Sequence, residues 1–266
     1  MVDLTGRLAL VTGGMQGVGL GAARAFAQAG AAVALHDRPG RDAGAVCAEL
    51  QALGASDVRF FAADLEDMAQ IDAMLGDLAA WGAPDILLNN AGIGQTDALA
   101  DLPRATWDRV LAVNLSAPFS LMQALLPGMA ARGYGRVINI ASIHGLVGNP
   151  GKAAYAAAKH GLVGLSRVAA MEYAEAGSRA SGGVTVNCIC PGWVDTPLVQ
   201  GMVAARQEAL GATREVAIAD ILGSKQPTRR GIDPAEIGAM ALWLTDPLSH
   251  NVTGAALPLD GGWTAH

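Results

Sequence analysis

The sequence has few charged residues, few aromatic residues and only three cysteines. Charged residues make up 16% and aromatic residues 5% of the 266 residues, whereas 52% are hydrophobic and 34 are glycine. This composition excludes an intrinsically disordered chain, a collagen-like repeat and a coiled coil. The 18 basic residues are outnumbered by 24 acidic ones, so we expect no general nucleic-acid-binding surface.

The cysteines are too few, and odd in number, for a disulfide framework. Cys188 and Cys190 are separated by one residue and lack the spacing and partners of a zinc site, so we expect no metal. We predict reduced thiols buried in strands, which fits a cytoplasmic protein. The apolar run Leu8–Val11 that follows Arg7 is too short for a secretory signal.

One uncharged stretch, Val110–Ala131, is long enough to span a bilayer. It carries polar residues and two prolines that a lipid-facing helix tolerates badly: Asn114, Ser116, Pro118, Ser120, Gln123 and Pro127. We therefore predict a helix buried against a sheet, and no membrane partner.

Short β-like runs alternate with longer helical patterns along the whole chain. The runs are 8–11, 32–36, 58–62, 86–89, 136–140, 184–189 and 255–258. This alternation predicts an α/β fold with a doubly wound parallel sheet, Rossmann-like, in a single domain over residues 1–266. The mixed segment at about 196–226 follows a Pro-Gly pair and is predicted to form a helical lid over a substrate site.

A glycine-rich turn links the first predicted strand to the first predicted helix. Its pattern is T-G-x-x-x-G-x-G, and its candidate cofactor contacts are Thr12, Gly13, Gln16, Gly17, Val18 and Gly19. Glycines let the backbone approach a pyrophosphate, and the helix N-terminus offers free N–H groups. The turn is therefore predicted to hold a dinucleotide.

The second predicted strand is followed by Asp37, 18 residues after Gly19. An acidic side chain near this spacing accepts the ribose hydroxyls of NAD and repels a 2′-phosphate. Arg38 favours NADP instead, but Gln16 gives the turn no cation, so we predict NAD. Further contacts at the ends of the third and fourth strands are expected from Asp64, Leu65, Asn90, Ala91 and Gly92.

Tyr155 and Lys159 are spaced to share one face of a predicted helix. A phenol is a poor base at neutral pH unless a nearby cation lowers its pKa, and Lys159 together with the cofactor is expected to do so. Ser142 can bind the reacting oxygen, and the apolar surroundings of Asn114 suit either a proton relay or a satisfied core amide. Only three of the 18 basic residues are lysine, and two of these flank Tyr155.

These motifs together resemble the short-chain dehydrogenase/reductase family over nearly the whole chain. The matching segments are TGGMQGVG (12–19), NNAG (89–92), Asn114, Ser142, YAAAK (155–159) and PGWVDT (191–196). The resemblance implies NAD(P)-dependent oxidoreduction of a secondary alcohol or ketone by a homotetramer. It implies Asn114, Ser142, Tyr155 and Lys159 as the catalytic tetrad. It also implies cofactor contacts by Tyr155, Lys159, Pro191, Gly192, Val194 and Thr196.

Within that family, the segments 139–147, 151–165, 188–200 and 224–227 and the tail 259–266 resemble bacterial D-3-hydroxybutyrate dehydrogenases. In those enzymes a Gln, a His, a Lys and a second Gln hold a carboxylate. His144 and Lys152 match the middle two. The first Gln position is Gly94, with Gln95 next to it. The second is Met202, with Gln200 nearby.

The substrate candidates are therefore Gln95, His144, Lys152, Gln200 and Met202, with Trp193 and Trp263 as possible walls. Asp195 is unusual beside a site for an anion. A small hydroxy acid such as 3-hydroxybutyrate is the first interpretation, and a neutral secondary alcohol, polyol or cyclic alcohol is the second. A catalytically silent NAD-binding scaffold is the third.

Overall fold

The computed structural model describes residues 2–196, 199–223 and 225–265. Of the predicted lid range, residues 197, 198 and 224 lie outside the described residues, as does His266 of the tail. The seven strands are β1 (Leu8–Thr12), β2 (Ala32–Asp37), β3 (Val58–Ala62), β4 (Ile86–Asn89), β5 (Tyr134–Ile140), β6 (Gly183–Pro191) and β7 (Ala256–Leu259). Each predicted strand is confirmed, and the bounds differ by at most two residues.

All seven strands are parallel and form one sheet in the order β3-β2-β1-β4-β5-β6-β7. The central strands are fully buried, because helices cover both of their faces. The strand order reverses between β1 and β4. Ligands of open α/β sheets bind beside such a reversal, at the carboxyl ends of the strands.

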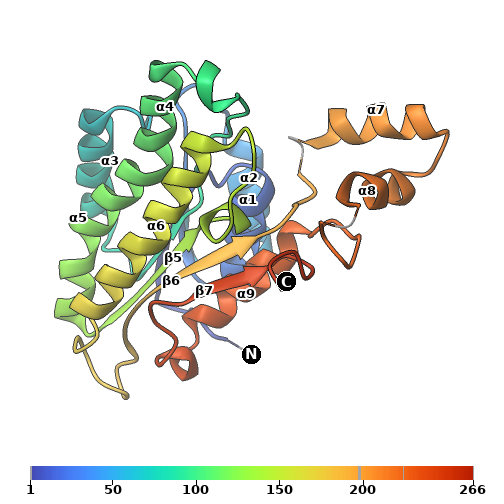
Figure 1. Ribbon diagram of the computed structural model, residues 1–266. Helices are drawn as coiled ribbons and strands as arrows, with labels where there is room; N and C mark the ends of the chain where they lie inside the picture. Colours follow the sequence, from blue (N-terminus) through green and yellow to red (C-terminus); the bar gives the residue numbers. More distant parts are fainter. Residues whose placement is uncertain (1, 197–198, 224, 266) are drawn as a thin grey trace.

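Helices form one layer on each face of the sheet (Figure 1). The helices of these layers are α1 (Gly17–Gln28), α2 (Gly44–Leu53), α3 (Met68–Trp81), α4 (Arg104–Leu111), α5 (Ala117–Arg132), α6 (Ala153–Glu172) and α9 (Pro234–Thr245), and two more helices are α7 (Gln200–Leu210) and α8 (Arg214–Leu222). One hydrophobic core joins the sheet to α1, α2 and α9, and a second joins it to α3, α5 and α6. The predicted doubly wound fold is confirmed.

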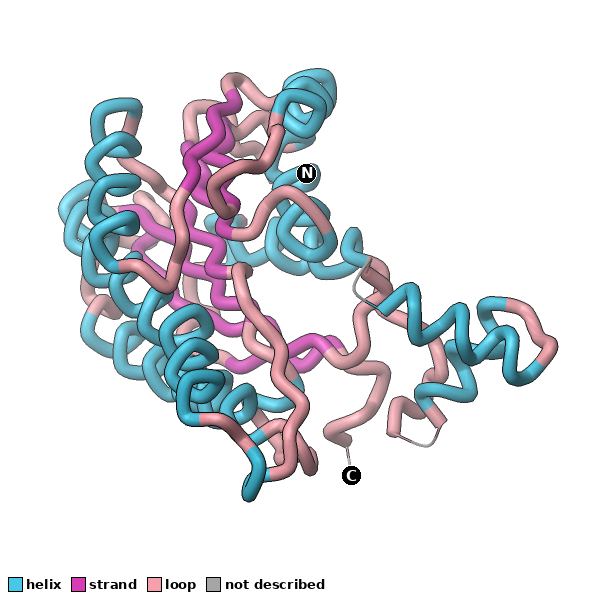
Figure 2. The backbone as a smooth tube through the Cα atoms, turned by 90° about the horizontal axis from the view of Figure 1, so that it is seen from above, coloured by secondary structure: helices cyan, strands magenta, loops and turns pink. Residues whose placement is uncertain are grey.

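Two helices, α7 and α8, lie apart from both layers. Figures 1 and 2 show them as a pair that extends beyond the carboxyl ends of the strands. Val203, Ala217, Ile218 and Leu222 pack the two helices together in a small core of their own, against which Trp193 packs. The segment predicted to form a helical lid contains this pair, and we use the word lid for α7 and α8.

The apolar stretch at 110–131 belongs to a helix that runs from Arg104 to Arg132. Its length and mean hydropathy of 1.4 would suit a membrane span, and 44% of its apolar window is buried within the protein. Leu121, Leu126 and Met129 pack in the core beneath the sheet. The predicted helix against the sheet is confirmed.

A π-helical turn, Ala112–Ser116, divides this helix into α4 and α5. Such turns are rare and concentrate at functional sites. Asn114 lies within this turn and is fully buried.

The cysteines follow the prediction in part. Cys188 and Cys190 are buried in β6, and all three thiols are free. Cys47 differs, because it lies half-buried in α2 rather than in a strand.

Candidate active site

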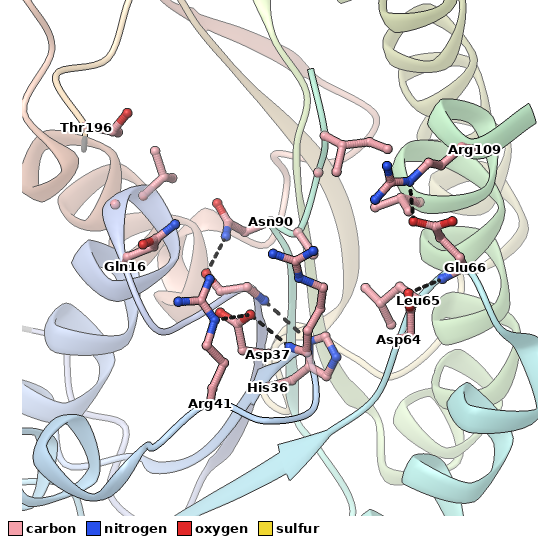
Figure 3. Close-up of a pocket in the computed structure, with 18 residues that line it drawn as sticks. Gln16, His36, Asp37, Arg41, Asp64, Leu65, Glu66, Asn90, Arg109 and Thr196 are labelled. Carbon is pink, nitrogen blue, oxygen red and sulfur yellow. Dashed lines mark hydrogen bonds and ion pairs between the residues drawn. The ribbon is translucent and has the colours of Figure 1, made fainter. Parts of the chain in front are cut away.

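A cavity of about 350 Å³ lies at the carboxyl ends of β1, β2 and β3 (Figure 3). It collects most of the predicted cofactor contacts: Gly13, Gln16, Gly17, Val18, Asp37, Asp64, Leu65, Asn90, Ala91, Gly92 and Thr196. The sequence missed other residues of its lining, among them His36, Arg41, Glu66 and Arg109.

The glycine turn is held in place from behind. The Asn90 side-chain amide donates to the carbonyls of Thr12 (2.9 Å) and Gly13 (3.0 Å), and the Thr12 hydroxyl accepts from the N–H of Asn90 (3.0 Å). A Cβ on Gly19 would lie 2.3 Å from the Gly13 carbonyl oxygen, so no side chain fits there. Thr12 and Gly19 do not line the cavity but shape the turn that does.

The side of the cavity at the end of β2 is lined by the acidic residue Asp37 and the basic residues Arg38 and Arg41. Asp37 Oδ1 accepts from the Arg38 N–H at 2.8 Å and lies 3.8 Å from Arg41 Nε. His36 is buried behind the turn, where Nδ1 accepts from the Gly13 N–H (3.4 Å) and Nε2 faces the Ala63 carbonyl (3.2 Å). Burial lowers the pKa of His36, which favours the neutral ring that these contacts require.

The opposite end of the cavity is closed by an ion pair. Glu66 Oε1 accepts from Arg109 Nε at 2.5 Å, which joins the loop after β3 to α4. Figure 3 shows this pair beside Asp64 and Leu65. The two residues lie 43 positions apart in the sequence, so no local pattern announces the contact.

The cavity fits a dinucleotide. Gln16 precedes α1 without capping it, so no side chain occupies the free N–H groups of the first turn. This cavity shares lining residues with a second one of about 400 Å³, namely Val18, Asn90, Gly92, Ile93 and Thr196. A ligand held at the turn can therefore extend from one cavity into the other.

The second cavity contains the predicted catalytic residues. Ser142, Tyr155 and Lys159 line it, with Ser142 just after β5 and the other two on α6. Pro191, Gly192 and Val194, which follow from the end of β6, also line it. We call the four residues that the sequence predicts to be catalytic, Asn114, Ser142, Tyr155 and Lys159, the catalytic floor.

Backbone contacts fix the floor. The Asn114 amide clamps the loop after β4, because its oxygen accepts from the Ile93 N–H and its nitrogen donates to the Ile93 carbonyl, both at 2.9 Å. Lys159 Nζ donates to the Ile140 carbonyl at 2.8 Å, at the end of β5. Asn114 is thus a satisfied core amide that positions the loop beside the cavity.

The electrostatics of the floor differ from the expectation. Burial raises the pKa of Tyr155, and a hydrogen bond with Ser142 opposes the shift only in part. Burial also lowers the pKa of Lys159 to about 8. Lys159 Nζ lies 5.7 Å from the centre of the Tyr155 ring. In the chain alone, desolvation therefore raises the phenol pKa, and the lowering predicted from Lys159 is not found.

Four of the predicted substrate residues line the second cavity: His144, Lys152, Trp193 and Trp263. Gln95, Gln200 and Met202 do not. The Gln95 amide nitrogen donates to the Gly151 carbonyl (3.0 Å), Gln200 contacts Asp195 (3.2 Å), and Met202 is exposed on the lid. Asp97 and Thr196 also accept from these two glutamines, so near and distant partners together hold Gln95 and Gln200.

Two residues that line this cavity, His144 and Trp193, each have a buried polar atom without a partner among the described residues. We call the part of the cavity lined by these two residues and Lys152 its upper end. His144 Nδ1 and Trp193 Nε1 are both buried and make no hydrogen bond to the described residues. The His144 ring lies edge-on to the rings of Tyr155 (6.1 Å) and Trp263 (6.3 Å). Burial, with a contribution from Lys152, lowers the pKa of His144. A buried polar atom without a partner costs free energy.

Lys152 brings a cation to the same end. Its Nζ donates to the Gln95 carbonyl (2.7 Å) and to the Thr96 hydroxyl. Burial lowers the pKa of this ammonium, and Asp97 opposes the shift. Gly94, which also lines the cavity, has no atom within 4 Å of the position of a Cβ. The cavity is thus open where a longer side chain would narrow it.

The two cavities thus bring the glycine turn close to the residues predicted to be catalytic, Ser142, Tyr155 and Lys159. Residues 7–207 match the family model described as short chain dehydrogenase. The chain therefore belongs to the short-chain dehydrogenase/reductase family, whose members use a nicotinamide cofactor.

Individual relatives cover nearly the full length. The chain is 42% identical over 264 residues to a D-beta-hydroxybutyrate dehydrogenase of Cupriavidus necator, covering 98% of this chain and 99% of the relative. It is 40% identical over 261 residues to the enzyme of that name from Rhizobium meliloti, covering 97% and 99%. The resemblance stated from the sequence is thereby confirmed.

A solved structure shares the fold. It is that of a 3-oxoacyl (acyl-carrier-protein) reductase from Agrobacterium tumefaciens C58 with NADP bound. Its TM-score is 0.87 at 30% identity, covering 97% of this chain and 95% of that one.

Proposed function

We propose that the protein is an NAD-dependent dehydrogenase that interconverts a small 3-hydroxy acid and the corresponding keto acid. The carbinol C–H bond breaks as hydride leaves, the O–H bond breaks as a proton leaves, and the C=O bond forms. The D-beta-hydroxybutyrate dehydrogenases of C. necator and R. meliloti support this substrate class.

The observation that carries the proposal is the polar end of the second cavity. His144 Nδ1 and Trp193 Nε1 lack partners there, and the Lys152 ammonium lines the same space. A carboxylate only accepts hydrogen bonds, so it can pair with the Trp193 indole N–H, with the Lys152 ammonium and with the His144 ring in the tautomer that carries its proton on Nδ1. Its binding would fix the hydroxyl of a short acid above Tyr155.

Bound NAD supplies the hydride acceptor, held by the glycine turn and by Asp37. Tyr155 takes the hydroxyl proton during oxidation and returns it during reduction. Ser142 donates a hydrogen bond to the reacting oxygen. Lys159 supplies a positive charge that, with the charge of oxidised cofactor, offsets the desolvation of the phenolate. Asn114 acts through the loop that it clamps at Ile93.

The contacts of Asp37 support the choice of NAD over NADP. Asp37 Oδ1 accepts from the main-chain N–H of Arg38 and faces the Arg41 guanidinium, and Oδ2 has no hydrogen bond or ion pair among the described residues. We propose that Oδ2 accepts the ribose hydroxyls. NADP is the alternative cofactor, because the cation of Arg38 or Arg41 can pair with a 2′-phosphate.

A neutral secondary alcohol, polyol or cyclic alcohol is the second candidate. The open space beside Gly94 and the position of Met202 outside the cavity favour it, because neither supplies a donor for a carboxylate. A silent NAD-binding scaffold is the third candidate, and turnover would exclude it.

Initial rates of NAD reduction across hydroxy acids, neutral secondary alcohols and polyols test the proposal. We expect the highest kcat/KM with a short 3-hydroxy acid. Faster turnover of every neutral alcohol would replace the acid interpretation with the second candidate. Binding of NADH without turnover of any substrate would leave the scaffold.

We also propose that residues 1–266 act as one unit with a lid at about 196–226, and that the chain assembles as a homotetramer, as its family resemblance implies. Free buried thiols suit the reducing cytoplasm. Light scattering after size exclusion measures the oligomer, and a mass of one or two chains would contradict it.

A further inference from the structure

Three polar side chains join the lid to the body of the protein. Asp195 Oδ1 accepts from Arg214 Nη2 at 2.5 Å and from Gln200 Nε2 at 3.2 Å. Arg214 Nη1 in turn donates to Gln200 Oε1 at 2.8 Å. Each residue contacts the other two, so the three form a closed ring, which we call the latch.

Each member of the latch belongs to a different part of the protein: the body, α7 or α8. Asp195 belongs to the body, because its N–H donates to the Ile232 carbonyl at 2.9 Å. Its neighbours Val194 and Thr196 both line the catalytic cavity. Gln200 is the first residue of α7 and Arg214 the first residue of α8. The ring thus ties the start of each lid helix to a segment that forms the cavity wall.

The second anchor of the lid lies where the chain leaves it, after α8. Gln226 is fully buried, accepts from the Trp193 N–H at 3.2 Å, and donates to the Arg230 carbonyl at 2.5 Å. It fixes the chain that returns from α8. Figure 1 shows α7 and α8 apart from the helix layers, and the latch restrains the side where the chain enters α7.

The latch also explains the acidic residue beside a site for an anion. The Asp195 side chain is 29% exposed and the Arg214 side chain 33% exposed, so the carboxylate is paired and partly screened from water. A network of this kind is worth more than a single exposed ion pair.

We infer that Asp195, Gln200 and Arg214 are positioning residues that hold α7 and α8 for substrate binding. The inference rests on the proposed function in that the second cavity receives the substrate. It goes beyond the catalytic floor, since none of the three touches the reacting atoms. The latch is expected to act on KM, because it places the cavity wall and leaves the proton-transfer groups unmoved.

The test compares Asp195→Asn, Arg214→Gln and the double variant with a matched control. The control, Asp220→Asn, removes a pair within the lid, where Arg206 Nε donates to Asp220 Oδ2 at 2.5 Å. We expect each latch variant to raise KM by about 3- to 10-fold with kcat nearly unchanged. The double variant should be no worse than the worse single variant, and the control should match the wild type.

Hydrogen exchange of the 200–210 and 214–222 amides gives a readout that needs no substrate. Exchange there should be faster in Asp195→Asn than in the wild type. An unchanged KM, a loss of kcat alone, multiplying effects in the double variant or unchanged exchange would each overturn the latch. If hydroxy acids are not turned over, the proposed function fails while the exchange result still decides the latch.

Discussion

The catalytic floor and the lid border the same cavity but are built from different contacts. In the floor, Asn114 is fully buried and Lys159 is 4% exposed, and both bind main-chain groups beside the sheet. In the lid, side chain pairs with side chain, and the side chains of the latch pair Asp195 and Arg214 are 29% and 33% exposed. Main-chain anchors hold atoms more firmly than exposed ion pairs. Changes in the floor should therefore lower kcat, and changes in the latch should act on substrate binding.

The largest effect is expected in the floor. Tyr155→Phe keeps the ring and removes only the hydroxyl that carries the proton. We expect kcat to fall by at least the ~10²-fold typical of losing an acid–base group, while NADH still binds. Tyr173→Phe, at the end of α6, is the matched control and should be fully active. Near-normal turnover in Tyr155→Phe would show that Tyr155 does not transfer the proton.

The next effect belongs to the upper end of the cavity. Lys152→Ala removes one charge-assisted contact, which is worth roughly 1.5–3 kcal/mol. The kcat/KM for a hydroxy acid should therefore fall by about 10- to 150-fold, and that for a neutral alcohol should hardly change. Lys225→Ala removes a lysine that lies over Trp263 at 5.9 Å but does not line the cavity, and should have a much smaller effect. Equal losses in the two variants would contradict a specific role for Lys152.

A smaller effect is expected in the cofactor cavity. Asp37→Ala removes the acceptor for the ribose hydroxyls, so kcat/KM with NAD should fall by about 10-fold and the preference over NADP should narrow. Asp42→Ala, which loses only a contact with the Gly44 N–H, should leave the preference unchanged. A wild-type kcat/KM with NADP equal to or above that with NAD would contradict the assignment.

The last prediction concerns stability and tests how deeply the floor is buried. The pKa of Lys159 is lowered from 10.5 to about 8 in the folded chain. Between these values the unfolded state binds more protons, so this group makes the protein more stable as pH rises. Cys188 and Cys190 oppose the trend, because burial raises their pKa values from 9.0 to about 11 and about 12.

The comparison of wild type with Lys159→Met isolates the lysine. In urea unfolding without cofactor, the free energy of unfolding of the wild type should gain on that of the variant from pH 8 to 10.5. A constant difference over that interval would mean that Lys159 is well solvated.

The sequence predicted the floor better than the upper end of the cavity, for a physical reason. Ser142 and Asn90 follow strands whose carboxyl ends must meet in a parallel sheet, and Tyr155 and Lys159 share a helix face. Local pattern therefore determines their placement. Gln95 bonds to Asp97 nearby but also to the distant Gly151. Gln200 bonds to Thr196 nearby but also to Arg214 on another helix. A local pattern does not include the distant partners, so it does not show that these side chains turn away from the cavity.

The same limit applies to charge. Asp195 looks out of place in the sequence because its partner Arg214 lies 19 residues further on, at the start of another helix. The raised pKa of Tyr155 likewise depends on burial, which the Tyr-Lys spacing does not report.

The most direct test of the account compares two substrates with one carbon skeleton in the wild-type enzyme. The kcat/KM for NAD reduction is measured with 3-hydroxybutyrate and with butan-2-ol, which differ by the carboxylate. If Lys152, His144 and Trp193 receive that group, the acid is preferred by roughly the 10- to 150-fold of one charge-assisted contact or more. Equal values, or faster oxidation of butan-2-ol, would show that the upper end of the cavity does not hold a carboxylate.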